Sequence, residues 1–493
     1  MAFTTQTFAF VFFSISIIFY YAIHFLQRKG ILSKALSKIR ADDLAIIFIS
    51  CVFYAWAGVG DFIRIALYIL LIYILGRAIQ GLKENNAHLV IYSDKEGKKL
   101  FFSKIVFVLS VAIVLFVLIY FKYINQAISL WNKLFKDGIG EKSIVAPLGI
   151  SFIMFSTISY LADIYMQKAK PGNIIDCALY ITFFPKIVSG PIELWRDFAT
   201  QKQRQITTNK IFYGINRFMI GFAKKVILAD TFGSIIASVG PPFDVLSAWL
   251  VGIAYMLQIY FDFAGYSDIA IGLAAMLGFN IKENFDSPYI STSITEFWRR
   301  WHMSLGRWFK EYVYIPLGGN RKGMKKTVIN LAIVFALTGL WHGATFGFLL
   351  WGLINGFCCI IERLIKDKKF YIRTPKIIKW FFTISITFFC WQLFRFGSYT
   401  ECIKWLGNLF GKQEGVVEYT WKFYYSIKNV SLVIVGILCS TILGLPKIKS
   451  VGNKFVQNKI GCVVTQIVIF VLFLVAILFM VSSNYSPFLY FQY

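Results

Sequence analysis

The sequence has little charge and no long hydrophilic stretch. Only 15% of its 493 residues are charged, 57% are hydrophobic, and the mean hydropathy is +0.64. No hydrophilic segment is long enough for a separate soluble domain of about 100 residues. These absences exclude a soluble globular protein, because apolar runs of about 20 residues, the length of a membrane span, recur along the chain. We expect one membrane-embedded domain over residues 1–493.

Patterns for metal binding and disulfides are also missing. The eight cysteines form no C-x-x-C pair and lie mostly in apolar stretches. They are therefore expected to be small buried hydrophobic side chains, and neither a disulfide framework nor a metal site is indicated. The N-terminus has no basic segment before its first apolar run and no small-residue cleavage site, so residues 7–26 are predicted to be a retained first span.

Acidic residues are scarce relative to basic ones. With 51 Lys and Arg against 25 Asp and Glu, the net charge is +26. On a soluble protein this excess would suggest nucleic acid as a partner. Here the basic residues lie in short loops between apolar stretches, which is the pattern of cytoplasmic loops attracted to anionic lipid. The expected partner is therefore the membrane, and no nucleic acid is expected.

The apolar stretches between Phe8 and Val481 predict an all-α polytopic membrane protein with about eleven to thirteen membrane-crossing or re-entrant helices. Loops 27–40 and 446–454 carry basic residues and no acid, so both are predicted to be cytoplasmic. This places the N-terminus and the C-terminus on the extracytoplasmic side.

Two apolar segments contain residues that are costly in a membrane. Residues 183–198 combine Lys186 with prolines and a glycine, which predicts broken backbone. A simple kink and a cavity-lining role remain open there. Asp262 and Asp268 lie within the apolar stretch 260–279, on either side of Gly265. Carboxylates in such positions serve a cavity or a partner, but they also cap a helix that breaks at a glycine, and both interpretations stay open.

Residues 293–316 are predicted to form one amphipathic helix near the cytoplasmic surface. Ser293 and Glu296 form a capping box at its start, and Pro316 ends it. Aromatic and apolar residues share one face at spacings of three and four, while a neighbouring face is mostly cationic. The first face contains Trp298, Trp301, Leu305, Trp308 and Tyr312, and the second contains Arg299, Met303, Arg307 and Lys310.

His302 and His342 each follow a tryptophan. The stretch from Thr327 to Trp341 gives about 22 Å of helix, short of the roughly 30 Å hydrocarbon core, so His342 is predicted to lie within the membrane. A neutral imidazole there is a competent base for a hydroxyl, although helix packing or proton conduction are alternatives. His302, on or beside the aromatic face, taken alone is more typical of a structural histidine.

Four motifs in order resemble the membrane-bound O-acyltransferase (MBOAT) family. They are PLGISF…SYLADIY, YFDFAGYSDIAIG, EFWRRWHMSLGRWFKEYVYIPLGGNR and GLWHG. The resemblance is strong over about residues 145–365 and weaker in the flanking parts 1–144 and 366–493. It is greatest to the bacterial branch of the alginate O-acetylation membrane subunit and the peptidoglycan O-acetyltransferase membrane proteins. A more distant likeness is to the protein that transfers D-alanine to teichoic acids.

The resemblance implies a ring of helices around a thin central catalytic region in a bacterial plasma membrane. It implies His342 as the catalytic histidine and His302 as the second family histidine. The donor would be acetyl-CoA, with no bound cofactor and no metal. The product would be an O-acetyl ester on an exopolysaccharide or on peptidoglycan, completed by an extracytoplasmic SGNH-type esterase or transferase.

The remaining expectations concern supporting residues. Arg299, Arg300, Arg307 and Lys310 either hold CoA phosphates or face anionic lipid. Trp298, Trp341, Asn355, Asp262 and Asp268 are expected to line or support the site, and Asn355 stands where relatives often have a histidine. The terminal F-x-Y-F sequence makes Tyr490 either a transient acyl carrier or an interfacial anchor. Two other functions stay open, D-alanyl transfer from a carrier-protein thioester and an ion pathway through Asp262, Asp268 and His342.

Overall fold

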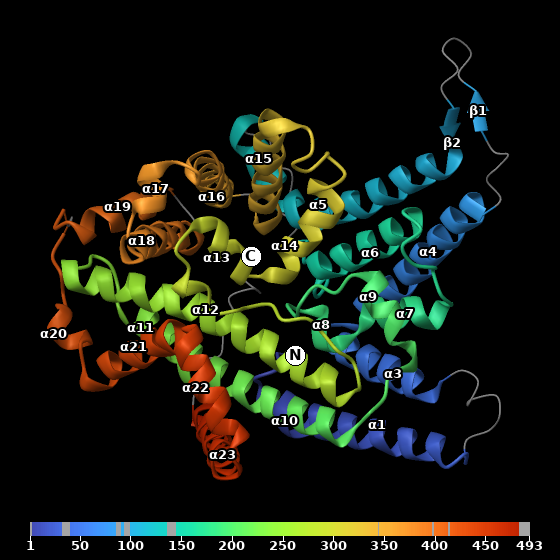
Figure 1. Cartoon of the computed structure of the whole chain (residues 1–493), viewed down its shortest axis with the longest axis horizontal. Coiled ribbons are helices and arrows are strands. Elements are labelled where there is room, and N and C mark those ends of the chain that lie inside the picture. Colours follow the sequence, from blue (N-terminus) through green and yellow to red (C-terminus); the bar gives the residue numbers. More distant parts are fainter. Residues whose placement is uncertain are drawn as a thin grey trace. The chain divides into compact units, whose positions relative to one another are not determined.

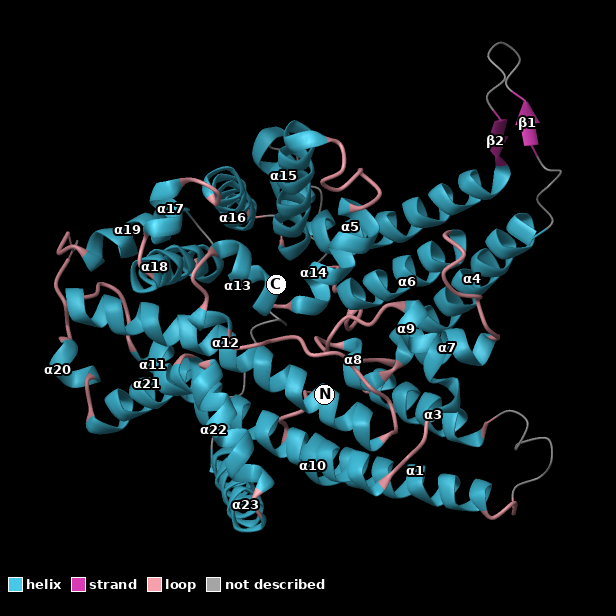
Figure 2. Cartoon of the chain, viewed as in Figure 1, coloured by secondary structure: helices cyan, strands magenta, loops and turns pink. Residues whose placement is uncertain are grey.

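The computed structural model describes residues 2–31, 40–84, 90–92, 99–135, 144–343, 345–396, 399–412 and 415–482. These residues are helical apart from turns, loops and one pair of short antiparallel strands (Figure 2). The strands are β1 (Val90–Tyr92) and β2 (Lys99–Phe101), and Val90 pairs with Phe101. The predicted all-α class is confirmed.

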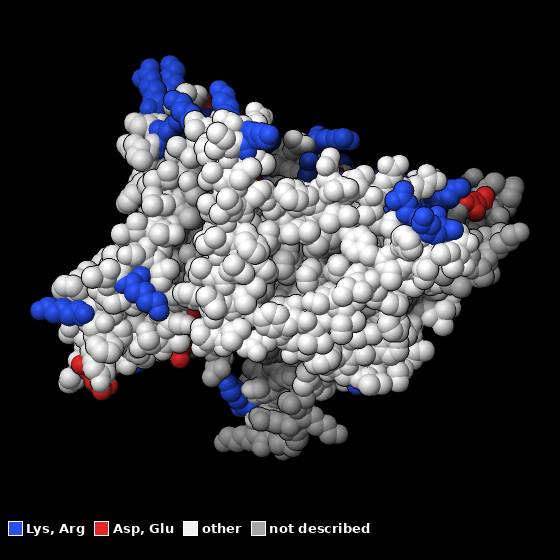
Figure 3. Space-filling view, turned by 90° about the horizontal axis from the view of Figure 1, so that it is seen from below, with Lys and Arg blue, Asp and Glu red and all other residues white. Residues whose placement is uncertain are grey.

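Nine helices within the described residues are long and apolar enough to cross a membrane. Figure 3 shows wide areas of surface without charged side chains, which suits helices that face lipid. The orientation of the termini stays a prediction. The nine are Thr7–Arg28 (η1, Thr7–Phe12, with α1, Phe13–Arg28), α4 (Val59–Glu84), α5 (Phe102–Phe135), α12 (Val245–Met276), α15 (Gly323–His342), α16 (Phe346–Ile365), α18 (Lys376–Arg395), Ile427–Gly444 (α21, Ile427–Ser440, with η6, Ile442–Gly444) and α23 (Lys459–Ser482).

The chain divides into two compact units. Unit 1 is Met1–Ile211 with Ala274–Ile281, and unit 2 is Phe212–Leu273 with Lys282–Tyr493. The single membrane-embedded domain expected over residues 1–493 stays a prediction. Besides the spans, unit 1 contains α3 (Ala41–Ala55), α6 (Ile150–Tyr165), α7 (Ile174–Thr182), α8 (Phe184–Ile187), α9 (Trp195–Ala199) and η2 (Thr200–Gln203).

Unit 2 contains most of α10 and shorter helices between its spans (Figure 1). These helices are α10 (Thr208–Ala223), η3 (Lys224–Ala229), α11 (Asp230–Ser238), η4 (Pro288–Ile290), α13 (Ile294–Arg300), α14 (Met303–Phe309), η5 (Lys310–Tyr314), α17 (Lys369–Arg373), α19 (Tyr399–Leu409), α20 (Trp421–Tyr424) and α22 (Pro446–Gln457).

In unit 1 the segment after α7 is broken, as predicted. The helix α8 has four residues, and irregular backbone follows until α9. The Lys186 side chain is buried, and its Nζ donates to Ser156 Oγ at 3.0 Å and lies 3.7 Å from the ring centre of Tyr180. Together with Ile187 and Pro191 it lines a cavity of about 10 Å³. The cavity-lining interpretation of this segment is therefore confirmed.

In unit 2, α12 runs without interruption through Gly265, so the interpretation in which the aspartates cap a helix that breaks there is wrong. The glycine serves close packing instead. A Cβ at Gly265 would lie 2.8 Å from the Gly221 carbonyl oxygen, and one at Gly221 would lie 2.6 Å from the Gly265 oxygen. Only glycine at both positions lets the backbones of α10 and α12 approach this closely.

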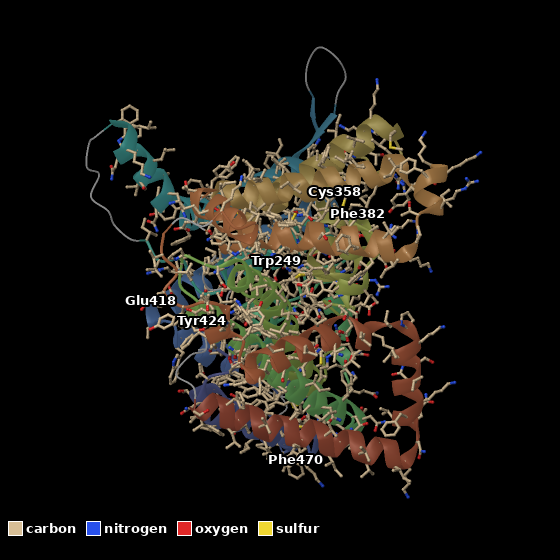
Figure 4. The ribbon with its side chains drawn as sticks, turned by 90° about the vertical axis from the view of Figure 1, so that its left-hand side faces the viewer. Trp249, Cys358, Phe382, Glu418, Tyr424 and Phe470 are labelled. Atoms are coloured by element: carbon tan, nitrogen blue, oxygen red, sulfur yellow. The ribbon has the colours of Figure 1, made fainter. Side chains whose placement is uncertain are left out.

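The outer faces of unit 2 are apolar. Phe382 on α18 and Phe470 on α23 are 62% and 53% exposed (Figure 4). Trp249 on α12 stacks instead on Phe388 of α18, with ring centres 5.4 Å apart. Exposed phenylalanine is costly in water and favourable in lipid, so these faces are those expected of membrane helices.

Candidate functional site

The helix predicted over 293–316 is divided into α13, α14 and η5. The chain breaks at Trp301 and His302, and His302 has a left-handed backbone with φ of 44°. Backbone hydrogen bonds from a distant loop replace the helical ones. Met303 N–H donates to the Asn284 oxygen, and Asp286 N–H donates to the Arg300 oxygen, each at 2.9 Å. The continuous-helix prediction is therefore wrong.

The start of α13 is held from two sides. Ser293 Oγ accepts from the backbone N–H of Glu296 at 3.0 Å, so the predicted helix start is confirmed. The Glu362 carboxylate on α16 accepts from the N–H groups of Ile294 and Thr295 at 2.6 and 2.8 Å. A carboxylate at a helix start is stabilised by the unpaired N–H groups of the first turn. Glu362 thus connects α16 to the segment that leads to His302.

His342 is the last residue of α15, which begins at Gly323 and has 20 residues. At 1.5 Å per residue this helix spans about 30 Å, enough to cross the hydrocarbon core. The expectation of a span too short to cross is wrong, because the helix starts four residues before Thr327. Membrane depth is therefore no argument for the role of His342.

Two glycines bring α15 and α16 together beside His342. A Cβ at Gly339 would lie 2.6 Å from a backbone oxygen of α16, and one at Gly352 would lie 2.5 Å from a backbone oxygen of α15. The close approach puts the His342 ring centre 5.1 Å from that of Trp351. Small residues at a helix crossing are what membrane packing requires.

Both motif histidines line one cavity of about 20 Å³ in unit 2. His302 is 2% exposed and His342 is 6% exposed. The break at Trp301 turns His302 into the protein interior, and its closeness to the cytoplasmic surface stays a prediction. Space for about one water-sized group remains between the side chains. The lining residues are Ile259, Asp262, Phe263, Trp298, Trp301, His302, Leu305, His342, Trp351, Trp391 and Phe394.

Aromatic rings form most of the wall of this cavity. Trp301 and Trp391 have ring centres 4.6 Å apart, and Trp298 and Trp351 have ring centres 5.3 Å apart in an edge-to-face arrangement. Such rings exclude water and have few rotamers, so they hold a small group in one place. Trp341 does not line the cavity, but its ring packs on His342 at 4.6 Å.

Asn355 supports this wall. Its Oδ1 accepts from Trp298 Nε1 at 3.2 Å, and its Nδ2 donates to the Trp351 carbonyl oxygen at 2.8 Å. The amide thereby joins two tryptophans of the cavity, one on α13 and one on α16. Trp298 and Asn355 both belong to the site, the first in the wall and the second behind it.

His302 is held by an amide. Its Nδ1 lies 3.0 Å from Asn284 Oδ1, and its ring meets Phe263 edge-on at 4.6 Å. Burial lowers the pKa of His302 to about 3. The imidazole is therefore neutral at physiological pH.

The two aspartates of α12 are held in ion pairs. Lys225 Nζ lies 2.7 Å from Asp262 Oδ1 and also bonds to Asp230. Asp268 Oδ1 accepts from Arg217 Nε at 2.8 Å. Although burial lowers the pKa of Lys225, the two carboxylates outweigh it and raise that pKa. Asp262 also lines the cavity, whereas Asp268 is not among the lining residues and its role stays a prediction.

The basic residues of the motif stand away from the cavity. Arg300 donates to Glu296 and Asp286 at 3.0 and 3.1 Å, which ties it to its own segment. Arg299 is exposed, and neither it nor Arg307 is among the residues that line the cavity. Their contact with CoA phosphates stays a prediction. Tyr490 lies outside the described residues, so the acyl relay also stays a prediction.

Several important residues were not predicted. Trp351 and Trp391 come from two later spans, and no local pattern marks them as partners of the histidine motifs. Asn284 lies in a loop whose sequence gives no such signal. Lys225 is different, because a lysine in the apolar run that follows α10 is costly unless paired. This cost is the signal from which an acidic partner such as Asp262 could have been inferred.

The arrangement is suited to proton transfer at a small group. Two imidazoles face one space from which aromatic rings exclude water, and a neutral imidazole accepts a proton from a hydroxyl. Within the described part of the chain, no three His, Cys, Asp or Glu side chains stand close enough to hold a metal ion. The geometry alone does not name a substrate.

Comparison with known proteins gives consistent results. Residues 98–399 match the model of the membrane-bound O-acyltransferase family. Over its whole length the chain is 35% identical to the whole of a probable alginate O-acetylase AlgI of Pseudomonas putida. It is 33% identical to a peptidoglycan O-acetyltransferase of Helicobacter pylori, over 59% of this chain and 62% of that one. It is 30% identical to a teichoic acid D-alanyltransferase of Bacillus subtilis, over 48% and 62%.

Proposed function

The chain belongs to the membrane-bound O-acyltransferase family, and from that premise we propose that it moves an acetyl group from cytosolic acetyl-CoA to an extracytoplasmic polysaccharide. The acceptor is an exopolysaccharide or peptidoglycan. One observation carries the proposal, namely that His302 and His342 line the same small aromatic-walled cavity.

The proposed chemistry needs one base at the cavity. His342 accepts the proton of the attacking hydroxyl, whose oxygen forms a bond to the thioester carbonyl carbon. The carbon–sulfur bond then breaks, and the proton passes from His342 to the leaving thiolate. His302 is neutral and assists by hydrogen bonding. Both imidazoles are held by packing, so little reorganisation accompanies the reaction.

The route across the membrane is part of the proposal. Positive loops suggest that acetyl-CoA enters from the cytoplasm and that both termini are extracytoplasmic. Arg299, Arg300, Arg307 and Lys310 would meet the donor phosphates. Tyr490 would accept the acetyl group on the far side before an SGNH-type enzyme completes the transfer. The names of the relatives support the class of acceptor, an alginate-like polysaccharide or peptidoglycan.

Two other functions are weighed against this one. An ion pathway through Asp262, Asp268 and His342 is disfavoured, because family membership makes the chain an acyltransferase and both aspartates are ion-paired. D-alanyl transfer remains the competitor within the family. It differs in its donor, a carrier-protein thioester, so the donor decides between them.

The test uses purified full-length protein in lipid nanodiscs with [¹⁴C]acetyl-CoA, an SGNH-type transferase and a soluble polysaccharide acceptor. We expect free CoA to be released and label to enter the acceptor. His342→Gln should abolish both signals. His24→Gln is the matched control, because His24 pairs with Asp42 at 2.9 Å in unit 1 and does not line the cavity. Turnover of a D-alanyl carrier thioester, with acetyl-CoA left intact, would replace the proposal with its competitor.

A further inference from the structure

The Asn284 side chain can be oriented without ambiguity. Its Oδ1 faces the backbone N–H of Ser304 at 3.3 Å and the Ser304 hydroxyl at 2.8 Å. A backbone N–H only donates, so the amide atom that faces it must be the oxygen. The other end agrees, because Asn284 Nδ2 donates to Ser267 Oγ at 3.0 Å. The amide therefore presents an acceptor to its surroundings on the His302 side.

That acceptor determines the tautomer of His302. Nδ1 lies 3.0 Å from Asn284 Oδ1, so it must carry the proton, since two lone pairs at this distance would repel. The Ser304 hydroxyl has one proton, and the 2.8 Å contact with Asn284 uses it better than the 3.5 Å contact with His302. The proton on Nδ1 leaves Nε2 with a free lone pair.

The Nε2 atom is buried and has no hydrogen-bond partner among the residues that the structure describes. His302 is 2% exposed, and its ring lines the cavity that His342 also lines. An unsatisfied buried acceptor is costly, so it calls for an explanation. The place of this atom in the cavity wall points to a hydrogen bond with a bound ligand.

We propose that Asn284 is a positioning residue, which holds His302 as the Nδ1–H tautomer so that Nε2 accepts a hydrogen bond from an O–H or N–H of the substrate. The proposal rests on the proposed function for the identity of that substrate. An amide N–H of the thiol arm of CoA supplies the required chemistry, because the attacking hydroxyl gives its one proton to His342. In this tautomer Nε2 has no proton to donate, so His302 does not stabilise the oxyanion.

Neighbouring charges do not disturb this state. Asp262 on α12 is the carboxylate that lines the cavity, and it pairs at 2.7 Å with Lys225, which also bonds to Asp230. His342 on α15 is the other titratable group in the wall. The low pKa that burial gives His302 agrees with a neutral ring. The tautomer itself follows from the amide contacts and would stand without that value.

The direct test is ¹⁵N NMR of the four histidines of the sequence, labelled in the full-length protein. His302→Gln assigns the His302 signals by their loss. We expect the shifts of a protonated Nδ1 and an unprotonated Nε2 at pH 7. A protonated Nε2 or a fully protonated ring at pH 7 would overturn the proposal. This measurement needs no activity, so its failure is distinct from failure of the proposed function.

Substitution of Asn284 gives a second readout. Asn284→Asp keeps the size and places a carboxylate against Nδ1–H, which raises the pKa of the histidine by about one to three units. The pH at which the His302 ¹⁵N shifts titrate should therefore rise. Ser304→Ala is the matched variant, because it removes the hydroxyl that donates to Asn284 Oδ1 and leaves the contact between Asn284 and His302, so the NMR tautomer should be kept. An unshifted His302 titration in a folded Asn284→Asp protein would contradict the positioning role.

Kinetics test the source of the hydrogen bond. With Asn284→Leu, loss of the tautomer should raise the KM for acetyl-CoA at least tenfold, which assigns the hydrogen bond to the amide of the thiol arm. A fall in kcat with the KM for acetyl-CoA unchanged would contradict substrate contact. Circular dichroism and size-exclusion elution verify that the variant is folded before it is assayed.

Discussion

Lys225 provides a sharp test of how unit 2 holds its buried charges. Its side chain is 2% exposed, and it bonds to Asp262 and Asp230, whose side chains are 2% and 9% exposed. Lys225→Met keeps the length and removes the cation, so both carboxylates stay buried without it. Breaking a buried pair by removing one partner costs about 3–5 kcal/mol. We expect a loss of stability of that size.

Thermal unfolding of the detergent-solubilised protein measures the loss. A change of 1 kcal/mol shifts the melting temperature by about 2–4 °C in units of 150–250 residues, so the expected fall is roughly 6–20 °C. Lys225→Met leaves the Asp262 carboxylate without the lysine that pairs with it, and the added substitution Asp262→Asn removes the charge of that carboxylate. The double variant should therefore cost about 0.5–3 kcal/mol less than the sum of the two single variants.

Lys428→Met is the matched control, because Lys428 is an exposed lysine of α21. It should change the stability by no more than about 0.5 kcal/mol. Equal melting temperatures for the Lys225 and Lys428 variants would refute the reasoning. Strict additivity of the two single substitutions would refute it as well, because partners in direct contact do not act independently.

Three further predictions concern the site and its surroundings. Gly352→Leu should reduce acetyl transfer about 100-fold, because its Cβ would lie 2.5 Å from a backbone oxygen of α15 and would displace His342. CoA release measures this, and Gly452→Leu, where a Cβ meets nothing within 4 Å, should leave it unchanged. As the pH is lowered from 6.5 to about 3, the free energy of unfolding should fall by about 1.4 kcal/mol per pH unit. The reason is that His302 takes up a proton in this range only in the unfolded chain. Denaturant midpoints measured against pH test this, and a slope that is unchanged in His302→Gln would contradict it. Tyr490→Phe keeps the aromatic ring and removes the hydroxyl, so the acetyl content of secreted polysaccharide should fall, and undiminished content would exclude the relay.

The apolar spans could be predicted well, because length and composition decide them. The last span was expected over 463–482, and α23 is Lys459–Ser482. The retained first span over 7–26 corresponds to the helix Thr7–Arg28. The start at Ser293 was also predictable, because a cap is a local interaction of four residues. The broken backbone at 183–198 was predictable as well, because a proline interrupts a helix locally.

The features that failed depend on distant residues. The break at His302 is made by hydrogen bonds with Asn284 and Asp286, and no periodicity in 293–316 contains them. Asp262 looked like a possible cap because its partner, Lys225, lies 37 positions earlier in the sequence. Gly265 suggested a break, but its role is contact with α10. In each case a tertiary contact overrides the local preference.

The two histidines differ by their surroundings rather than by their depth. The sequence suggested that His302 lies at the surface and His342 within the membrane, yet both line one cavity. Asn284 fixes the tautomer of His302, and burial keeps that ring neutral at pH 7. A group with so low a pKa is a poor base, although it accepts a hydrogen bond well. We therefore propose His342 as the residue that removes the proton, while the buried Asn284 amide, which the motifs do not contain, sets the tautomer of His302.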